Sequence, residues 1–524
     1  MAFRLYDTRL QKQVEFTPLH PGEARIYNCG PTVYGIPHIG NFRSFLFADL
    51  LRRHLEWRGL KVTQVMNITD VGHLTEDDVA DAQGEDKLQK AARDLGWDPF
   101  KVARHFEEIF HRDRKRLRIK DAHVYPRATD HIREMLVLIQ KLLDNGHAYV
   151  PEGSGEVYYD LASFPKYGEL SHKNVDELVA GARVEVDEKK RNPADFFLWK
   201  VDPGHLMQWD PHDSKLWEGF KGGQPKLDPR IKKGFPGWHI ECSAMSMKYL
   251  GETFDIHTGG EDNIFPHHEC EIAQSEGVTN KPFARHWMHT RYLLVDNKKM
   301  SKRAGTLFNL DDLVTKGYGE REVRYSMLAN HYRQPMNFTL EGLDAARASV
   351  ERLENCRALL MEQAVIPAQA GIQSSVQSLA GKLKHDFGEA LDDDLNMPNA
   401  LAALFGFVNE VNKLKPVGAD AKLALDALDD VNRVLDIFDA TAKSHLVTKD
   451  DGTALVVSAG TIDVAGLLAR TSHDEESVKL LVAARFDARA KKDFATSDRI
   501  RDELKVRGVI LEDTKDGVRF KLPQ

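Results

Sequence analysis

With 524 residues, the chain is too long for a single hydrophobic core, so several domains are expected. Its hydrophobic fraction of 42% and mean hydropathy of −0.44 are those of a soluble globular protein, and no apolar run reaches the roughly 18 residues of a membrane span. The formal net charge of −8 argues against a protein that coats nucleic acid with its whole surface, but leaves room for a local basic face. Because the N-terminus lacks a signal-peptide layout and the four cysteines are too few for a disulfide framework, we expect a cytoplasmic protein.

The first elements in chain order are a strand, a loop, a helix and a second strand. Residues 24–30 form a short β-prone run, and a loop rich in proline and glycine follows it. Apolar residues at helical spacing predict a helix over residues 42–58, with Gly59 as its stop. Residues 60–70 predict the next strand, so this part of the chain has the pattern of a parallel sheet.

Ligands of parallel sheets bind beyond the carboxyl ends of the strands, so we expect Cys29, His38 and Thr69 at one edge. A second stretch of strands and a helix covers residues 253–308. The sequence therefore predicts an α/β fold with a Rossmann-like parallel sheet that an α/β insertion splits into two halves. A helical bundle and a small C-terminal domain follow. The expected segments are a first half at 1–111, a connective insertion at 112–235, a second half at 236–310, a linking segment at 311–340, a bundle at 341–447 and a C-terminal domain at 461–524.

The bundle is predicted from a single apolar stripe that begins near residue 341. Near residues 363–378 the helical period is lost in a run of Pro, Gly, Ser and Gln, which we interpret as an inserted linker. Residues 448–460 form a second polar break. From Lys479 to Gln524 there are 12 Lys/Arg and 8 Asp/Glu, a balance that fits either a solvated helical surface or a contact with nucleic acid. The residues of the stripe are Leu343, Ala346, Val350, Leu353, Cys356 and Leu360.

A metal centre is one interpretation of residues 265–274. His267 and Glu271 are four positions apart, so on a helix they share one face and can reach a single ion. With Cys29 and Cys242 they would make a mixed Zn²⁺ site drawn from distant parts of the chain. The alternative is a simple histidine–glutamate pair on a wet surface. His268 and Cys270 are expected to point elsewhere on the helical wheel.

Two short segments suggest a phosphate site. Residues 37–41, PHIGN, join a loop to a helix N-terminus, where backbone N–H groups favour an anion. Residues 298–305, KKMSKRAG, place four basic side chains on a loop that follows a strand, which is suited to neutralising polyphosphate charge. The two segments in this order, on either side of a split sheet, are more specific than either one alone.

These segments resemble the class I aminoacyl-tRNA synthetases, whose HIGH and KMSKS signatures correspond to residues 38–41 and 299–303. Within that class the chain is similar to the cysteinyl-tRNA synthetase family. The resemblance extends through most of the chain, including residues 491–513 near its end. The family's blocks occur here in order as YNCGPTVYG, NITD, GWHIECSAM, DIHTGGEDNIFPHHECEIAQ and KKMSKRAGT.

The resemblance implies a role for each matching residue. One Zn²⁺ per chain would bind the substrate thiolate and thereby prefer cysteine to serine, so that no editing domain is needed. The zinc ligands would be Cys29, Cys242, His267 and Glu271. The cysteine pocket would contain Gly30, Thr32, Thr69, Trp238 and His257. The ATP site would contain His38, Gly40, Asn41, Lys299, Ser301 and Lys302, of which His38, Asn41, Lys299 and Lys302 would be catalytic.

The implied reaction joins L-cysteine, ATP with Mg²⁺, and tRNA(Cys) on a monomer that needs no membrane. Two rivals are a ligase that passes cysteine to a small amine, as in mycothiol biosynthesis, and a non-catalytic paralogue that binds RNA or amino acid. The C-terminal tail favours the tRNA enzyme over the first, and the retained zinc ligands and Lys302 favour it over the second. The chain departs from the signatures at Asn41 and Arg303. Cys270 is a further departure, which suggests an oxidisable thiol near the site.

Overall fold

The computed structural model describes residues 2–76, 83–173, 189–221, 223–300, 307–366, 373–438, 444–449, 454–458, 475–490, 493–514 and 517–521. The chain forms two compact units. The first contains Met1–Ala346 and Gly388–Ala400, and the second contains Arg347–Phe387 and Leu401–Gln524. Among the helices described, none combines the length and the apolar character that crossing a membrane requires.

A four-stranded parallel sheet lies at the centre of the first unit, in the order β12-β11-β3-β4. β3 (Glu23–Asn28) and β4 (Lys61–Met66) come from the start of the chain, and β11 (Phe254–Gly260) and β12 (Ala284–Thr290) come from beyond its middle. Because β3 pairs directly with β11, the two distant segments build one sheet. The split sheet predicted from the sequence is therefore confirmed.

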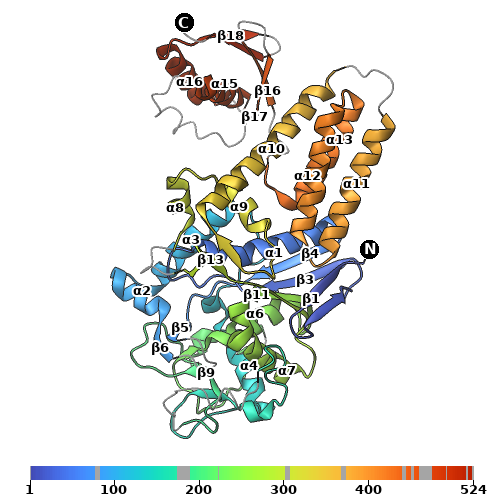
Figure 1. Ribbon diagram of the computed structural model, residues 1–524. Helices are drawn as coiled ribbons and strands as arrows, with labels where there is room; N and C mark the ends of the chain where they lie inside the picture. The colour runs from blue at the N-terminus through green and yellow to red at the C-terminus, as the bar shows by residue number, and fades with distance from the viewer. Residues whose placement is uncertain are drawn as a thin grey trace. The chain divides into compact units, whose positions relative to one another are not determined.

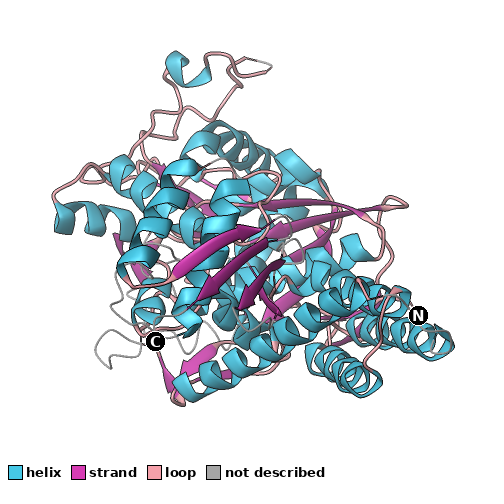
Figure 2. Cartoon of the chain, turned by 90° about the horizontal axis from the view of Figure 1, so that it is seen from above, coloured by secondary structure: helices cyan, strands magenta, loops and turns pink. Residues whose placement is uncertain are grey.

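Helices cover both faces of this sheet. α1 (Ile39–Trp57) connects β3 to β4 on one face, while α6 (Trp238–Leu250) and α7 (Glu269–Thr279) pack against the other (Figure 1). The view from above shows the strands enclosed between helices (Figure 2). The chain leaves β3 and β11 toward opposite edges, so the crevice beyond their carboxyl ends is a topological switch point, the usual ligand site of such sheets.

The local sequence explains where α1 begins and ends. His38 caps the helix, since its imidazole accepts a hydrogen bond from the Asn41 N–H while the Asn41 side chain accepts one from the His38 N–H. After Trp57 the chain turns at Gly59 with φ of 90°, a conformation that glycine adopts readily. The predicted stop is thus confirmed.

The insertion between the two halves of the sheet forms its own four-stranded sheet, in the order β10-β9-β8-β7. The expected boundary at residue 111 is wrong, because α3 continues through it as one helix. Val124 also pairs with Val65, which belongs to β4, so the chain returns to the main sheet after α3. The elements are β5 (Leu74–Glu76), β6 (Gln83–Asp86), α2 (Lys87–Leu95), α3 (Pro99–Arg116), η1 (Ala128–His131), α4 (Ile132–Asp144), β7 (Ala148–Tyr149), β8 (Val157–Tyr159), η2 (Leu161–Ser163), β9 (Phe196–Lys200), η3 (Ser214–Trp217) and β10 (Phe235–Pro236).

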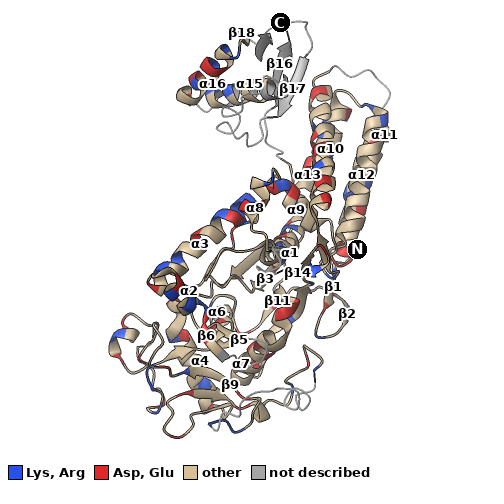
Figure 3. Ribbon diagram, turned by 60° about the vertical axis from the view of Figure 1, so that its left-hand side comes forward, with Lys and Arg blue, Asp and Glu red and all other residues tan. Residues whose placement is uncertain are grey.

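Small elements complete the first unit. A three-stranded sheet in the order β14-β13-β15 follows the main sheet, and an N-terminal hairpin precedes it. Arg112 and Arg116 of α3 form ion pairs with Asp311 of α8, so basic and acidic side chains alternate where these helices meet (Figure 3). The elements are β1 (Arg4–Asp7), β2 (Lys12–Glu15), η4 (Glu261–Asn263), η5 (Ile264–His268), β13 (Leu293–Val295), β14 (Lys298–Lys299), α8 (Leu310–Thr315), α9 (Glu320–Leu328) and β15 (Met336–Phe338).

Four long helices follow, and the first of them carries the predicted apolar stripe. They are α10 (Leu340–Ala364), α11 (Gln373–Asp392), α12 (Met397–Leu414) and α13 (Ala419–Leu435). All six residues of the predicted stripe on α10 are buried. The linker expected near 363–378 is shorter than predicted, since α11 already begins at Gln373 and buries Val376 against its neighbours. Residues 367–372 of that linker lie outside the described part of the chain.

The C-terminal part contains a sheet in the order β17-β16-β19-β18, with two helices before its last strands. The polar break expected at 448–460 is wrong in its described part, because residues 444–449 and 454–458 form an antiparallel pair. Since β16 also pairs with β19, the sheet includes residues from before the expected boundary at 461. The elements are β16 (Ser444–Lys449), β17 (Ala454–Ser458), α15 (Glu475–Ala490), α16 (Phe494–Val506), β18 (Ile510–Thr514) and β19 (Gly517–Lys521).

Candidate active site

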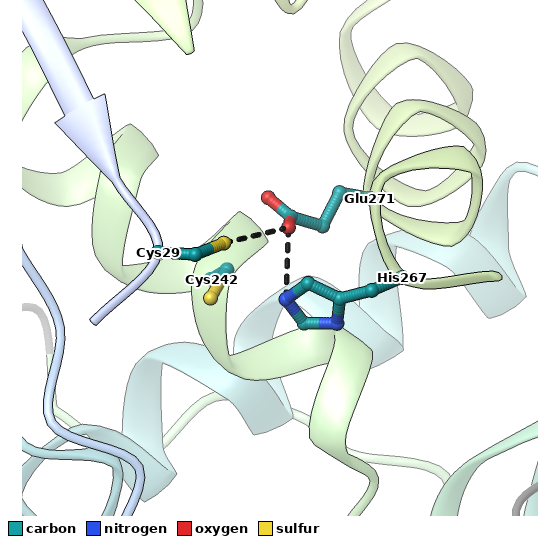
Figure 4. A group of neighbouring side chains, drawn as sticks. All are labelled: Cys29, Cys242, His267 and Glu271. Carbon is teal, nitrogen blue, oxygen red and sulfur yellow. Dashed lines mark hydrogen bonds and ion pairs between the residues drawn. The ribbon is translucent and has the colours of Figure 1, made fainter. Parts of the chain in front are cut away.

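Four side chains of types that can bind a metal ion converge at the carboxyl ends of β3 and β11. Cys29 follows β3, Cys242 lies on α6, His267 on η5, and Glu271 in the first turn of α7, and all four point to one centre (Figure 4). One donor atom from each lies within 4.8 Å of the donor atoms of the others. Glu271 Oε1 is 3.0 Å from His267 Nε2 and 3.9 Å from Cys29 Sγ. All four are buried, so the alternative of a histidine–glutamate pair on a wet surface is excluded.

His268 also reaches this centre, which corrects the prediction that it points elsewhere. Its Nε2 lies 3.1 Å from Cys29 Sγ, and it forms a second possible ligand set with Cys29, His257 and Glu271. His268 and Glu271 are three positions apart, so even on a regular helix they are neighbours on one face, and the prediction from the helical wheel was wrong for His268. Within residues 264–268 only Phe265 has extended angles, φ of −135° and ψ of 132°, and it precedes both histidines.

Further histidines contact the candidate ligands. His239 Nδ1 lies 2.9 Å from His267 Nδ1, which leaves Nε2 of His267 to face Glu271. On the other side, His268 Nδ1 lies 2.8 Å from His289 Nε2. Such contacts fix which ring nitrogen of a histidine faces an ion. His239 and His289 were not predicted from the sequence; their only signal is their position one turn before Cys242 and at the end of a strand.

The charges at the centre fit a soft divalent cation. Burial alone would raise the pKa of Cys242, but its hydrogen bond with Cys29 and the nearby His267 lower it to about 6. Burial likewise opposes charge on Glu271, yet His257 and His267 lower its pKa to about 2. Burial raises the pKa of the Cys29 thiol. Two thiol groups, an imidazole and a carboxylate are a donor set that zinc accepts.

The residues expected in the cysteine pocket lie around this centre. Thr32 pairs with Thr69 where the chain continues beyond β3 and β4. Gly30 is in a crowded position, since a Cβ atom there would lie 1.8 Å from the carbonyl oxygen of Asn67. Trp238 is half-buried, and its indole stacks on the His267 imidazole with ring centroids 4.0 Å apart.

His257, also expected in the cysteine pocket, contacts one of the candidate ligands. Its side chain is fully buried, and its Nε2 lies 2.9 Å from Glu271 Oε2. It therefore supports a candidate ligand from behind. Glu241, which was not predicted from the sequence, accepts a hydrogen bond from the Thr69 hydroxyl at 3.1 Å. Burial holds the pKa of Glu241 well above the usual range of a carboxyl group.

The two signature segments also meet. The Ile39 N–H donates to the Phe308 carbonyl at 2.9 Å, and His38 pairs with Asn309. Gly40 packs so closely against Met300 that a Cβ atom would lie 2.2 Å from its terminal methyl group. The segments on both sides of the KMSKR loop therefore lie against the start of α1.

Only the start of the KMSKR loop belongs to the described part of the chain. The backbone of Lys299 pairs with Leu294 at the start of the loop. Ser301, Lys302 and Arg303 lie outside the described residues, as does the side chain of Lys299. Burial lowers the pKa of His38, so this imidazole is neutral at neutral pH.

Comparisons with known families agree along the chain. Residues 15–211 and 206–348 match the model of the class I (C) tRNA synthetase catalytic domain. Residues 386–439 match the DALR domain, and residues 475–520 match the cysteinyl-tRNA ligase anticodon binding domain. The matches therefore cover both of the compact units.

Individual relatives give the same result. The cysteine–tRNA ligase of Symbiobacterium thermophilum is 41% identical over 99% of this chain and 100% of its own. That of a Thermus thermophilus strain is 41% identical over 100% of both chains. Among solved structures, a Mycobacterium tuberculosis methionyl-tRNA synthetase with methionyl-adenylate gives a TM-score of 0.54 at 14% identity, covering 79% of this chain and 90% of its own. This last likeness shows the class I fold alone. On the full-length matches, the chain belongs to the cysteine–tRNA ligase family of class I aminoacyl-tRNA synthetases.

Proposed function

We propose that this chain activates L-cysteine with ATP and transfers it to tRNA(Cys). In the first step a carboxylate oxygen of cysteine bonds to the α-phosphorus of ATP and pyrophosphate leaves. In the second step a ribose hydroxyl of the tRNA's terminal adenosine attacks the carbonyl carbon and AMP leaves. The observation that carries this proposal is the convergence of Cys29, Cys242, His267 and Glu271 at the carboxyl ends of β3 and β11.

The metal ligands follow from the donor set. Cys29, Cys242, His267 and Glu271 would hold one Zn²⁺, because this set offers two sulfur donors and excludes water through burial. When bound there, zinc would favour a substrate thiolate over the hydroxyl of serine. Trp238 and Thr32 would enclose the rest of the amino acid. The crowded Gly30 would let the backbone approach it closely.

The ATP end would be formed by the two signature segments. Since Nδ1 of His38 accepts a hydrogen bond from the Asn41 N–H, the neutral ring carries its proton on Nε2. This N–H is available to a phosphate oxygen. Asn41, Gly40, Lys299, Ser301 and Lys302 would complete the site, with the two lysines opposing the phosphate charge that Mg²⁺ partly neutralises.

The match of residues 475–520 to an anticodon binding domain supports tRNA as the acceptor. A ligase that acts on a small amine has no use for such a domain. The charge pattern supports the same partner only weakly, because basic and acidic side chains are mixed on α16, as Figure 3 shows.

The test is cysteine-dependent exchange between ATP and pyrophosphate, run beside serine, with and without a zinc chelator. We expect exchange with cysteine that the chelator abolishes and added zinc restores. A preference for cysteine above about 200-fold would exceed what pocket shape alone supplies. Charging of tRNA(Cys) then identifies the acceptor. Folded, zinc-loaded protein that gives no exchange would contradict the proposal.

A further inference from the structure

A three-ring stack connects the candidate metal centre to a histidine without any signature of its own. The indole of Trp238 lies between two imidazoles. One is His267, with ring planes 17° apart, and the other is His73, with centroids 4.0 Å and planes 10° apart. His73 is only 8% exposed, so this end of the stack is buried, while Trp238 is half-buried. His73 therefore packs against the face of Trp238 opposite to His267, which is a candidate ligand.

The hydrogen bonds of His73 define which of its nitrogens carries the proton. Its Nε2 lies 2.8 Å from Lys87 Nζ, and its Nδ1 lies 2.7 Å from Thr32 Oγ1. A lysine ammonium group only donates, so Nε2 accepts and the neutral ring carries its proton on Nδ1. Nδ1 therefore donates to the Thr32 hydroxyl. The hydroxyl's own hydrogen is then directed away from His73.

Thr69, which pairs with Thr32 through the backbone, has a different arrangement. Its hydroxyl accepts a hydrogen bond from Asn67 Nδ2 at 3.0 Å and donates to Glu241 Oε2 at 3.1 Å. Its hydrogen is thus committed to a buried carboxyl group. Of these two threonines, Thr32 is the one that His73 prepares as a donor.

The support for His73 is built from the start of α2. The Lys87 N–H donates to the His73 carbonyl at 2.9 Å. Asp86, which caps α2, accepts a hydrogen bond from the Gly72 N–H at 2.7 Å. Backbone and side chain together therefore fix residues 72–73 to this helix.

From these contacts we propose that His73 is a positioning residue for the amino-acid pocket. It directs the Thr32 hydroxyl toward a carboxylate-derived oxygen of the bound amino acid and holds Trp238 flat on His267. Lys87 selects the tautomer that makes this possible. The inference rests on the proposed function, because it assigns the pocket around Thr32 and Trp238 to the amino acid.

Two substitutions separate the two tasks. His73→Phe keeps an aromatic ring under Trp238 but removes both hydrogen bonds. We expect it to raise KM for cysteine in pyrophosphate exchange by about tenfold, the effect of one hydrogen bond, and to leave KM for ATP within about twofold. His73→Asn can still donate to Thr32 but removes the stack. It should retain most of the affinity for cysteine and shift the fluorescence of Trp238, obtained by subtracting the emission of Trp238→Phe backgrounds.

A double-mutant cycle tests the route through Thr32. If His73 acts through that hydroxyl, His73→Phe combined with Thr32→Val is no worse than Thr32→Val alone. His105→Phe is the matched control, since His105 also lies beside a tryptophan, Trp97, but belongs to the exposed surface of α3. Neither KM should change in that control.

Three results would overturn the proposal. One is an equal rise of both KM values together with a lower unfolding temperature, which would indicate a purely structural role. The others are multiplicative effects in the cycle and unchanged Trp238 emission in His73→Asn. If the unmodified protein gives no exchange at all, the proposed function fails, whereas the emission measurement still decides whether His73 positions Trp238.

Discussion

His267 Nε2 lies 3.0 Å from Glu271 Oε1, in a place where neither side chain reaches solvent. Two cysteines lie close to this buried imidazole and carboxylate. The negative charge that these donor atoms can carry must be compensated there, either by a bound cation or by protons. Burial of unpaired charge is costly, so removal of one donor should change what the other three bind.

Replacement of Cys242 by serine tests the candidate metal centre. The hydroxyl stays protonated near neutral pH and is a poor zinc ligand, so we expect loss of bound metal. Affinity for cysteine should fall by at least about tenfold, while affinity for ATP is retained. Atomic emission measures the metal, and equilibrium binding measures the two ligands. Cys356→Ser is the control, because Cys356 is buried in α10 of the other unit. Unchanged metal content in Cys242→Ser would rule out this ligand.

Gly30→Ala should damage the pocket because the backbone approaches too closely for a side chain. The added Cβ would lie 1.8 Å from the Asn67 carbonyl oxygen, and a backbone atom cannot move aside as a flexible side chain can. We expect destabilisation of about 1–3 kcal/mol and a rise in KM for cysteine. Gly35→Ala is the matched control in the same loop, since its Cβ would meet no atom within 4 Å. Similar thermal unfolding of the two variants would contradict the crowding at Gly30.

Glu107 supplies a pH-dependent contribution to stability. Burial would raise its pKa, but the nearby imidazole of His111 and the hydrogen-bonded guanidinium of Arg127 lower it to about 2. The lowered pKa makes the folded state favour the ionised form, so its contribution is complete above the unfolded pKa of 4.5 and is lost as pH falls toward 2. Glu107→Gln should therefore lower the unfolding temperature at pH 7, and the difference from the unmodified protein should shrink below about pH 4.5. The exposed neighbour Glu108 provides the control Glu108→Gln. A difference that does not shrink at all between pH 4.5 and pH 3 would show that the carboxylate charge is not responsible.

Val376→Asp should affect the charging of tRNA more than the activation of cysteine. Val376 is fully buried on α11, so a charge there destabilises the second unit, whereas the candidate active site lies in the first. We expect cysteine-dependent pyrophosphate exchange to be retained and charging of tRNA to fall. Gln377→Asp, at an exposed neighbour, should leave both intact. Equal loss of exchange and charging would show that the units are not independent in this respect.

Cys270 should be inert in the folded protein. It is fully buried, and its sulfur lies 3.4 Å from the Tyr167 hydroxyl, so an oxidant or labelling reagent has no access. Mass spectrometry after brief alkylation should find Cys270 unmodified, and modified after denaturation. Rapid labelling of the native chain would revive the hypothesis of a redox-sensitive thiol.

The features of the fold that were predicted correctly are those with a regular hydrophobic period in the sequence. The split sheet and the stripe on α10 each rest on a repeated pattern that burial enforces, whereas α1 begins at Ile39, three residues before the predicted start. His268 was missed because positions three apart on a helix also share a face, so His268 lies beside Glu271 as His267 does. His73 was missed because its partners Thr32 and Trp238 are contacts of the folded chain only. The strands of the C-terminal sheet were missed because they are short and interrupted by polar residues.

The spacing of the ligands along the chain has a consequence for synthesis. Cys29 and Glu271 are 242 positions apart, and β11 must reach β3 before they can meet. A chain that emerges from the ribosome N-terminus first therefore carries Cys29 as an unprotected thiol until α6 and α7 have followed. Closing so long a loop is entropically costly. An ion that binds only after β3 and β11 have paired would stabilise the folded sheet against reopening.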